Sequence, residues 1–212
     1  MGAGKKNKPI LPEGDSWDAY DCLLQQKLSK KRYRHSLAVM ERAVFLAEKF
    51  GADVEKARLA GLLHDVMKDT EEKILLQFIE NSDILLTYAD RAAPQLWHAI
   101  GGAAYLRLQL RIEDGDVLNA VRYHTTGRAG MSLLEKVIYL ADLTSADRSY
   151  PDVEKTRKIV DRNLDQGMLY SMKFLICDLA SREKPLHPDT LACYQELVMA
   201  GVRTNDLPDP AA

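Results

Sequence analysis

Cysteine is scarce in this chain of 212 residues, which contains only Cys22, Cys177 and Cys193. The three lie far apart and form no Cys-X-X-Cys pair, so the sequence shows neither a disulfide framework nor a thiolate cluster for a structural metal. This pattern argues against a small secreted scaffold and is typical of a reducing compartment. We expect each of the three to be a small, buried apolar side chain.

Long apolar runs and an excess of charge of one sign are also absent. No stretch approaches the roughly 18 apolar residues of a membrane-spanning helix, and the polar segment Met1–Asp15 lacks the apolar core of a secretory signal. Lys and Arg number 29 against 31 Asp and Glu, so the net charge is -2. A generally basic nucleic-acid-binding protein is therefore excluded. We expect a cytoplasmic protein that binds neither a membrane nor a nucleic acid.

Strand-like alternation, internal repeats and linkers rich in Gly, Pro or Ser are missing as well. Apolar residues make up 46% of the chain and charged residues 28%, as in ordinary globular domains. The predicted fold is therefore all-α, a single helical bundle over residues 16–201. We expect residues 1–15 to be a flexible lead-in and residues 202–212 to be a loose tail.

Apolar residues at helical spacing predict the individual helices. Over residues 28–50 they recur three or four apart, at Leu37, Met40 and Val44, which we take as the core-facing stripe. Gly51 then ends this helix. Further helices are predicted at about 54–66, 70–80, 94–111, 116–126, 132–142, 153–162, 163–180 and 189–201.

Local signals indicate where some of these helices start. Capping boxes at Asp69–Glu72 and Ser132–Glu135 are predicted to open two of them, and Pro94 suits the first turn of a third. The pair Gly101-Gly102 inside that third helix costs about 1 kcal/mol per glycine relative to Ala. Close packing against a neighbouring element or close approach of a ligand would explain this pair, and we favour packing.

The dipeptide His64-Asp65 carries the most chemical information. It lies in the apolar, helix-forming segment Leu59–Met67, where an unpaired buried carboxylate is costly. Imidazole and carboxylate together suit a divalent metal ion, which would compensate the charge. A single histidine in such a segment is more often a hydrogen-bonded core residue, so the interpretation depends on further ligands.

Four further candidate ligands are present. His35 lies near the start of its helix, and Asp142 ends an apolar stretch. His98 and His124 add two imidazoles within or beside apolar segments. Helix bundles build metal sites from inward-facing side chains of this kind. Six ligands exceed the need of one ion that leaves room for water, and they fit two ions that share Asp65 as a bridge.

The order His35, then His64-Asp65, then Asp142 resembles the H…HD…D pattern of the HD-domain metal-dependent phosphohydrolases. The resemblance extends to the bacterial HD-domain symmetrical bis(5'-nucleosyl)-tetraphosphatases over about residues 20–197. It rests on the segments Arg32–His35, Ala60–Asp69, His98–Ala103, Arg122–Met131, Leu134–Asp142 and His187–Thr190. It implies an all-α HD fold, a binuclear centre that usually holds iron, and cleavage of diadenosine tetraphosphate into two ADP by a metal-activated water.

The same resemblance implies roles for individual residues. It implies one metal held by His35, His64, Asp65 and Asp142, and a second held by Asp65, His98 and His124. Asp65 and Lys68 would serve catalysis, and the segment His187–Thr190 would close over the nucleotide. The nucleotide would be lined by His35, Asp65, Lys68, His98, His124, Thr125, Asp142 and Arg148.

Residues beside the ligands suit phosphate binding. On a helix, Lys68 would share a face with the His64-Asp65 pair, so its ammonium would neutralise phosphate oxygens; a solvated lysine is the alternative. The turn Thr125–Arg128 offers hydroxyls, a permissive glycine and a guanidinium, against the alternative of an ordinary polar loop. Arg148 is interpreted as a phosphate clamp, with a surface arginine as the alternative.

Two alternatives to the implied function stay open. One is another HD nucleotide phosphohydrolase, nucleotidase-like; the other is a regulator that binds metal and nucleotide without turnover. The donors suit iron, which we favour, and also manganese, cobalt, nickel and zinc. The expected partner is a dinucleoside polyphosphate or another nucleotide, and the sequence is compatible with a homodimer.

Overall fold

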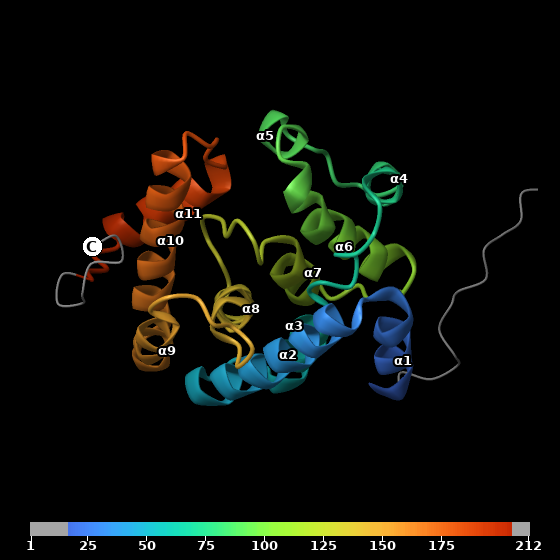
Figure 1. Ribbon diagram of the computed structural model, residues 1–212, viewed down its shortest axis with the longest axis horizontal. Coiled ribbons are helices and arrows are strands. Elements are labelled where there is room, and N and C mark those ends of the chain that lie inside the picture. The colour runs from blue at the N-terminus through green and yellow to red at the C-terminus, as the bar shows by residue number, and fades with distance from the viewer. Residues whose placement is uncertain (1–16, 205–212) are drawn as a thin grey trace, which may run out of the picture.

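The computed structural model describes residues 17–204, and all regular structure in this range is helical, which confirms the all-α prediction. The predicted lead-in 1–15 lies outside the described residues, as does 205–212 of the predicted tail. In Figure 1, α7 and α8 lie in the middle, with α4 and α6 on one side and α9 to α11 on the other. The elements are α1 (Trp17–Lys27), α2 (Lys30–Phe50), α3 (Val54–Leu63), α4 (Glu72–Glu80), α5 (Tyr88–Arg91), the 3-10 helix η1 (Pro94–Leu96), α6 (Trp97–Leu108), α7 (Gly115–Arg122), α8 (Leu133–Thr144), α9 (Val153–Arg162), α10 (Leu164–Ser181) and α11 (Pro188–Met199).

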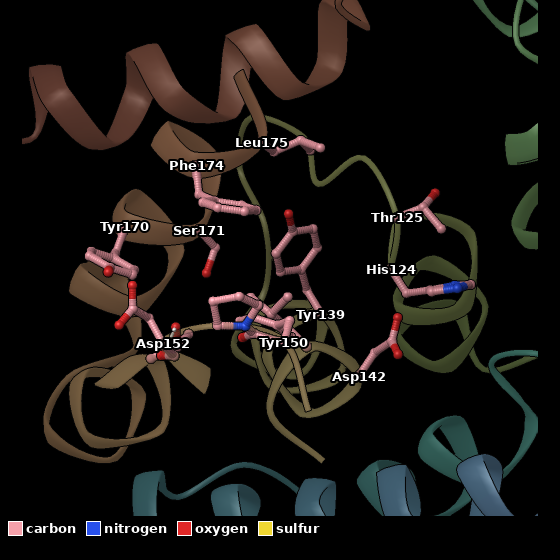
Figure 2. Close-up of a pocket in the computed structure, with 13 residues that line it drawn as sticks. His124, Thr125, Tyr139, Asp142, Tyr150, Asp152, Tyr170, Ser171, Phe174 and Leu175 are labelled. Carbon is pink, nitrogen blue, oxygen red and sulfur yellow. Dashed lines mark hydrogen bonds between the residues drawn. The ribbon is translucent and has the colours of Figure 1, made fainter. Parts of the chain in front are cut away.

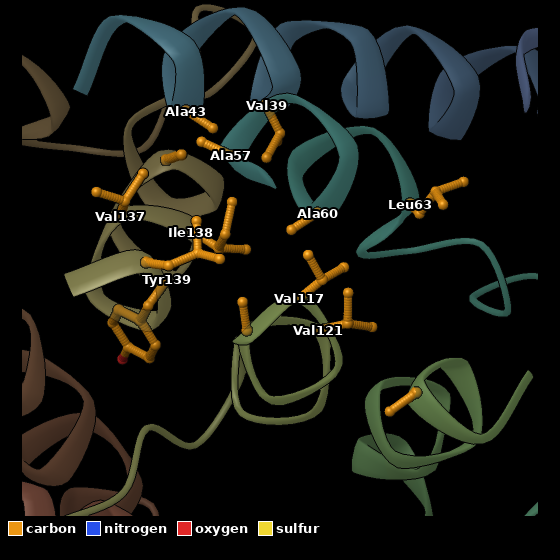
Figure 3. Close-up of a cluster of buried hydrophobic side chains, with 14 of the residues drawn as sticks. Val39, Ala43, Ala57, Ala60, Leu63, Val117, Val121, Val137, Ile138 and Tyr139 are labelled. Atoms are coloured by element: carbon orange, nitrogen blue, oxygen red, sulfur yellow. The ribbon is translucent and has the colours of Figure 1, made fainter. Parts of the chain in front are cut away.

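The central core lies between α2, α3, α7 and α8, which pack against one another. From α2, Val39 and Ala43 are completely buried in it (Figure 3). The predicted stripe is correct only in part: Leu37, Met40 and Val44 are half-buried rather than buried, and Leu37 and Met40 pack against the core. The fully buried side chains of α2 are instead Ser36, Val39, Ala43, Leu46 and Ala47.

Small residues let α2 and α3 approach closely. A Cβ atom on Gly61 would lie 3.0 Å from the Cα of Met40 and 3.1 Å from the Cβ of Ala43. A larger residue at position 61 would therefore push the two helices apart at this crossing. The close approach brings the start of α2 beside the end of α3, and therefore His35 beside His64.

The glycine pair in α6 serves packing, as predicted. A Cβ on Gly101 would lie 3.0 Å from Leu75 Cδ2, and one on Gly102 would lie 3.4 Å from Val121 Cγ1. Helix α6 is therefore held tightly between α4 and α7. This position carries His98, the second residue of α6, into the centre of the molecule.

The segment around the His64-Asp65 pair differs from the prediction. Helix α3 ends at Leu63, and residues 64–69 form turns rather than helix. The capping box predicted at Asp69 is also wrong: α4 begins at Glu72, and its N-cap Glu71 makes no side-chain hydrogen bond. Asp69 instead accepts a hydrogen bond of 2.8 Å from the backbone N–H of Ser29, so a tertiary contact replaces the local cap.

Other helix ends follow local signals more closely. Ser132 and Glu135 form the predicted capping box at the start of α8. Helix α2 ends at Gly51, which adopts the left-handed conformation with φ 79°. Helix α7 starts after the cap Asp114 rather than at Asp116, and it ends at Arg122, so His124 lies in the following turn. The sequence analysis did not predict α1 and the short α5.

The cysteines are not uniformly buried, contrary to the prediction. Cys22 and Cys177 are exposed, and only Cys193 lies in the core. Within residues 17–204, no helix combines the length and apolar character that a membrane crossing requires.

Candidate metal centre

A cluster of six side chains lies where the central helices meet two turns. His35 comes from α2, His98 from α6 and Asp142 from α8. The turns that follow α3 and α7 supply the other members, which are His64, Asp65 and His124. Five of the six residues are buried, and Asp142 is half-buried. The structure therefore brings together all six ligands that the sequence suggests.

Asp65 lies at the middle of this cluster. Its Oδ1 lies 3.4 Å from Nε2 of His98 and 3.6 Å from Nε2 of His124, while its Oδ2 lies 3.7 Å from Nε2 of His64. The two carboxylate oxygens thus face different imidazoles. A carboxylate placed in this way can bridge two cations.

Asp142 lies at one end of the cluster. Its Oδ1 lies 2.9 Å from Nε2 of His35 and 4.0 Å from Nε2 of His64. The ligand atoms of His35, His64 and Asp142 all lie within 4.8 Å of one another, as do those of His64, Asp65 and His124. Each group is compact enough to hold a metal ion.

Backbone carbonyls orient three of the imidazoles. In each, Nδ1 lies within hydrogen-bond distance of the carbonyl oxygen three residues earlier, and because a carbonyl can only accept, Nδ1 donates. The pairs are His64 with Gly61 at 2.8 Å, His98 with Gln95 at 2.8 Å and His124 with Val121 at 2.7 Å. Each Nε2 therefore carries the lone pair and is directed at the carboxylates, an anchoring that metal-binding histidines usually show.

Two buried atoms of the cluster make no hydrogen bond with the described residues. They are Nε2 of His64 and Oδ1 of Asp65. A buried polar atom without a partner costs about 1–3 kcal/mol. A divalent cation would satisfy both atoms, and the mixed nitrogen and oxygen donors suit first-row metals. The residues present therefore fit a metal site.

The local electrostatics favours neutral imidazoles at His64 and His98 beside ionised carboxylates. Burial lowers the pKa of His64 to about 4 and the pKa of His98 to about 3. Burial by itself would raise the pKa of Asp65, but the imidazoles of His64 and His124 hold it well below its ordinary value. At Asp142 the hydrogen bond from His35 outweighs burial, so the pKa of this carboxyl is lowered as well. These protonation states are the ones that bind metals.

Lys68 lies at the end of the cluster opposite to Asp142. Its Nζ is 2.9 Å from Nε2 of His98 and 4.0 Å from Oδ1 of Asp65. Burial lowers the pKa of Lys68. The predicted proximity to the cluster is confirmed, but the predicted reason is wrong, because Lys68 lies in a turn and not on a helix face.

Two arginines contact the carboxylates of the cluster. The guanidinium of Arg148 pairs with Oδ1 of Asp142, and its Nε donates to the Asp142 carbonyl at 2.8 Å. Arg32 Nη1 lies 3.4 Å from Oδ2 of Asp65. The sequence analysis gave Arg32 no role, although its position three residues before His35 on α2 places both on one helix face.

A further residue that the sequence analysis missed is Asp147. Its Oδ2 lies 2.9 Å from Nδ1 of His35, and its Oδ1 accepts a 2.7 Å hydrogen bond from the Ser145 hydroxyl. Asp147 thus anchors His35 as backbone carbonyls anchor the other imidazoles. No local pattern marks it, because it lies in the loop after α8 and reaches His35 only through the fold.

The predicted phosphate-binding turn is supported only in part. Thr125 is half-buried next to His124 and faces the cavity described below. The guanidinium of Arg128, in contrast, forms two hydrogen bonds of 2.6 and 2.9 Å with the carboxylate of Glu135. Glu135 is only 1% exposed, and a buried carboxylate needs such a partner. Arg128 therefore stabilises the start of α8.

The segment His187–Thr190 lies between two other parts of the molecule. His187 Nε2 is 3.1 Å from Oδ1 of Asp90 in α5, and the hydroxyl of Thr190 donates to the Thr126 carbonyl at 2.8 Å. The start of α11 is therefore tied both to α5 and to the turn that holds His124.

A cavity of about 280 Å³ adjoins the cluster. His124, Thr125 and Asp142 lie at one end of it (Figure 2). The remaining wall comes from α8, α9, α10 and the loop between α8 and α9. It includes four aromatic side chains, which are Tyr139, Tyr150, Tyr170 and Phe174. A molecule in this cavity would therefore touch the candidate ligands.

The all-helical fold and the cluster together place the chain in the class of helical domains with a His/Asp metal centre. The HD domain family matches residues 32–147, a range that includes all six cluster residues. The chain belongs to the HD-domain family. Members of this family depend on divalent metal ions, in agreement with the two groups of potential ligands.

Similar proteins are known over nearly the whole chain. It is 40% identical to a symmetrical bis(5'-nucleosyl)-tetraphosphatase of Bacillus subtilis, a match that covers 85% of this chain and 96% of the relative. A protein of the same name from Halalkalibacterium halodurans is 41% identical, with 84% and 94% covered. A crystal structure from Clostridium acetobutylicum, described as an HD superfamily hydrolase involved in NAD metabolism, is 37% identical with a TM-score of 0.85, covering 87% of this chain and 98% of that one.

Proposed function

We propose that the chain hydrolyses diadenosine tetraphosphate symmetrically, giving two molecules of ADP. The observation that carries the proposal is the compact cluster of four imidazoles and two carboxylates, found in a chain that matches symmetrical tetraphosphatases over nearly their whole length. Cleavage breaks the central phosphoanhydride: a water oxygen bonds to one phosphorus, and the bridging oxygen leaves with the other ADP.

The cluster would hold two divalent ions, with iron favoured and manganese, cobalt, nickel or zinc compatible with the donors. In this assignment His35, His64, Asp65 and Asp142 bind one ion, while Asp65, His98 and His124 bind the other. When bound, such ions lower the pKa of an attacking water and neutralise charge on the phosphates. The contacts of Asp65 with imidazoles through both of its oxygens support its role as the bridge.

The cations around the cluster would bind the phosphates. Lys68 Nζ lies 2.9 Å from Nε2 of His98, and it becomes free to contact a phosphate oxygen once that nitrogen is a ligand. Arg148 pairs with Asp142 and Arg32 approaches Asp65, so both guanidinium groups lie within a short side-chain movement of the same phosphates. Charge-assisted hydrogen bonds of this kind stabilise the charge that develops in phosphoryl transfer. A cytoplasmic location and a homodimer stay predictions.

The test is product analysis with the metal-loaded protein. The full chain is incubated with iron, manganese or cobalt and diadenosine tetraphosphate, and the products are separated by chromatography. We expect ADP as the sole nucleotide product. An equimolar mixture of ATP and AMP would contradict symmetrical cleavage, and an absence of turnover with tight nucleotide binding would favour a regulator.

Matched variants assign the activity to the cluster. Asp65→Asn removes the central charge, and we expect it to lower turnover by at least about 100-fold, since a neutral amide is a much weaker ligand than the carboxylate that the two ions would share. Asp83→Asn removes the same charge from a side chain that is 69% exposed and pairs with Arg107, so it should retain full turnover. A panel of mononucleotides assayed in parallel detects a nucleotidase-like preference, which would replace the proposed substrate.

A further inference from the structure

The loop between α8 and α9 carries two groups of the site on a backbone without regular structure. Residues 145–152 form neither helix nor strand. Asp147, which anchors His35, and Arg148, which pairs with Asp142, both belong to this loop. Side chains on a loop are placed less precisely than those on a helix unless other parts of the fold hold the loop. Whatever holds this backbone therefore also places Asp147 and Arg148.

One side chain of α9, Arg157, binds three backbone carbonyls around this loop. Its Nε donates to the carbonyl of Thr144, the last residue of α8, at 3.0 Å. Its Nη2 donates to the carbonyls of Ser145 at 2.5 Å and Arg148 at 3.1 Å. The side chain of Arg157 is only 20% exposed, so water competes weakly for these bonds. The three carbonyls enclose the turn in which Asp147 lies.

The chemistry of arginine suits this task. The last carbonyls of α8 have no donor within the helix and form the negative end of its dipole, where a cation is stabilising. A planar guanidinium presents its N–H groups in a fixed geometry, so one arginine can hold several carbonyls in a defined arrangement. The remaining nitrogen, Nη1, pairs with the carboxylate of Glu154 on the same helix. Arg157 therefore constrains the orientation of the loop as well as its distance from α8.

Two short connections lead from Arg157 to the metal centre. In the first, Ser145, whose carbonyl Arg157 binds, donates from its hydroxyl to Oδ1 of Asp147 at 2.7 Å. Oδ2 of Asp147 in turn lies 2.9 Å from Nδ1 of His35. In the second, Arg157 binds the carbonyl of Arg148, whose guanidinium pairs with a candidate metal ligand. The first connection reaches a candidate metal ligand, and the second reaches a group proposed to bind phosphate.

We propose that Arg157 is a positioning residue, which holds the loop after α8 so that Asp147 supports metal binding and Arg148 binds phosphate. The phosphate part of this inference rests on the proposed function. The hydrogen bonds of Arg157 with described residues go to backbone carbonyls and to Glu154, so its influence on the site passes through the loop. Loss of Arg157 should therefore weaken metal binding and polyphosphate binding together.

The experiment compares Arg157→Gln with Arg42→Gln in the full chain. Arg42 is a matched control because it is also largely buried and also joins the end of α8 to α9, but through side chains. Its Nε donates to the Thr144 hydroxyl at 3.0 Å, and its Nη2 lies 2.6 Å from Oδ1 of Asp161. Both substitutions thus remove a buried guanidinium at the same helix end, and only Arg157→Gln releases the loop backbone.

Calorimetry measures the binding of manganese, and then the binding of inorganic tripolyphosphate to the manganese-saturated protein. Arg157→Gln should raise the Kd for manganese about tenfold, the lower end of the range for lost support of a metal ligand. It should raise the Kd for tripolyphosphate about tenfold as well, the equivalent of one hydrogen bond to a charged group. Arg42→Gln should keep both values within twofold of wild type.

A double variant separates positioning from a general loss of stability. If Arg157 acts on the metal through Asp147, adding Arg157→Gln to Asp147→Ala should raise the Kd for manganese no further than Asp147→Ala alone. Circular dichroism verifies folding, and if Arg157→Gln is unfolded, Arg157→Lys replaces it, because an ammonium keeps the charge but not the planar set of donors.

Three results would overturn the inference. They are a manganese Kd within twofold of wild type in the Arg157 variant, additive effects in the double variant, and equal losses in Arg42→Gln. If the wild type fails to cleave diadenosine tetraphosphate but the binding comparisons hold, the proposed function falls and the positioning role of Arg157 stands.

Discussion

At the scale of single residues, the imidazoles are positioned by atoms that the helices leave without partners. The last carbonyls of an α-helix have no intrahelical donor. Gly61 at the end of α3 and Val121 at the end of α7 supply such carbonyls to His64 and His124. The two helix ends are thereby capped, and each Nε2 is turned toward Asp65. The same contacts thus satisfy the helix ends and orient the candidate ligands.

Asp147 gives a prediction about positioning. It does not touch the candidate metal sites directly but holds His35 through a 2.9 Å contact. Loss of such an anchor typically costs about 10–100-fold in metal affinity. We expect Asp147→Ala to raise the Kd for manganese within this range, with kcat near wild type at saturating metal, and Asp147→Asn, which keeps an acceptor oxygen, to recover part of the affinity. A lowered kcat at saturating metal with unchanged Kd would contradict this role.

The three thiols give a second prediction at this scale. Cys22 and Cys177 are exposed, whereas Cys193 is buried and its pKa is raised by burial to about 11. A raised pKa means that at pH 8 the Cys193 thiol is protonated and unreactive. A disulfide reagent at this pH should therefore label two thiols in the native protein and three in denaturant. Rapid labelling of three thiols in the native state would contradict the burial of Cys193.

At the scale of elements, the turn after α7 depends on the glycine at position 127. Gly127 has φ 64°, and a Cβ there would lie 2.7 Å from Met172 Cε. Gly130 has φ 66°, but a Cβ there would have no atom within 4 Å. The substitution Gly130→Ala therefore measures the cost of the left-handed backbone alone. Alanine in the left-handed region costs about 1–2 kcal/mol, and overpacking typically adds about 1–3 kcal/mol.

We therefore predict that Gly127→Ala lowers the free energy of unfolding by about 2–5 kcal/mol and Gly130→Ala by about 1–2 kcal/mol. Urea denaturation of both variants beside the wild type measures the difference. Equal losses in the two variants would show that Met172 moves aside without cost, and they would contradict the tight packing of this turn.

The sequence predicted helix ends correctly where contacts within a few residues determine them. Gly51 and the Ser132–Glu135 capping box determine the end of α2 and the start of α8 through contacts within a few residues. The end of α3 was misplaced because the apolar Val66 and Met67 continue the helical pattern of the segment, yet residues 64–69 form buried turns. Asp69 likewise pairs with Ser29, 40 residues earlier, and no local pattern contains that contact.

At the scale of the whole molecule, the cluster exists only through tertiary packing. His35 and Asp142 are 107 positions apart in the sequence and 2.9 Å apart in the structure. Their types, and their order around the His64-Asp65 pair, made this meeting predictable, because few other arrangements compensate two acids in apolar segments. The cavity beside the cluster was not predictable in this way, since Tyr139, Tyr170 and Phe174 have the spacing of ordinary core residues.

Metal content per chain tests the central claim most directly. The purified full chain is loaded with iron, loosely bound ions are removed, and the metal is quantified by mass spectrometry beside Asp65→Ala and the exposed control Asp83→Ala. The account predicts about two ions per chain for the wild type and the control, and the loss of at least one in Asp65→Ala, because that carboxylate is shared. Less than one ion per chain in the wild type, or an unchanged content in Asp65→Ala, would contradict it.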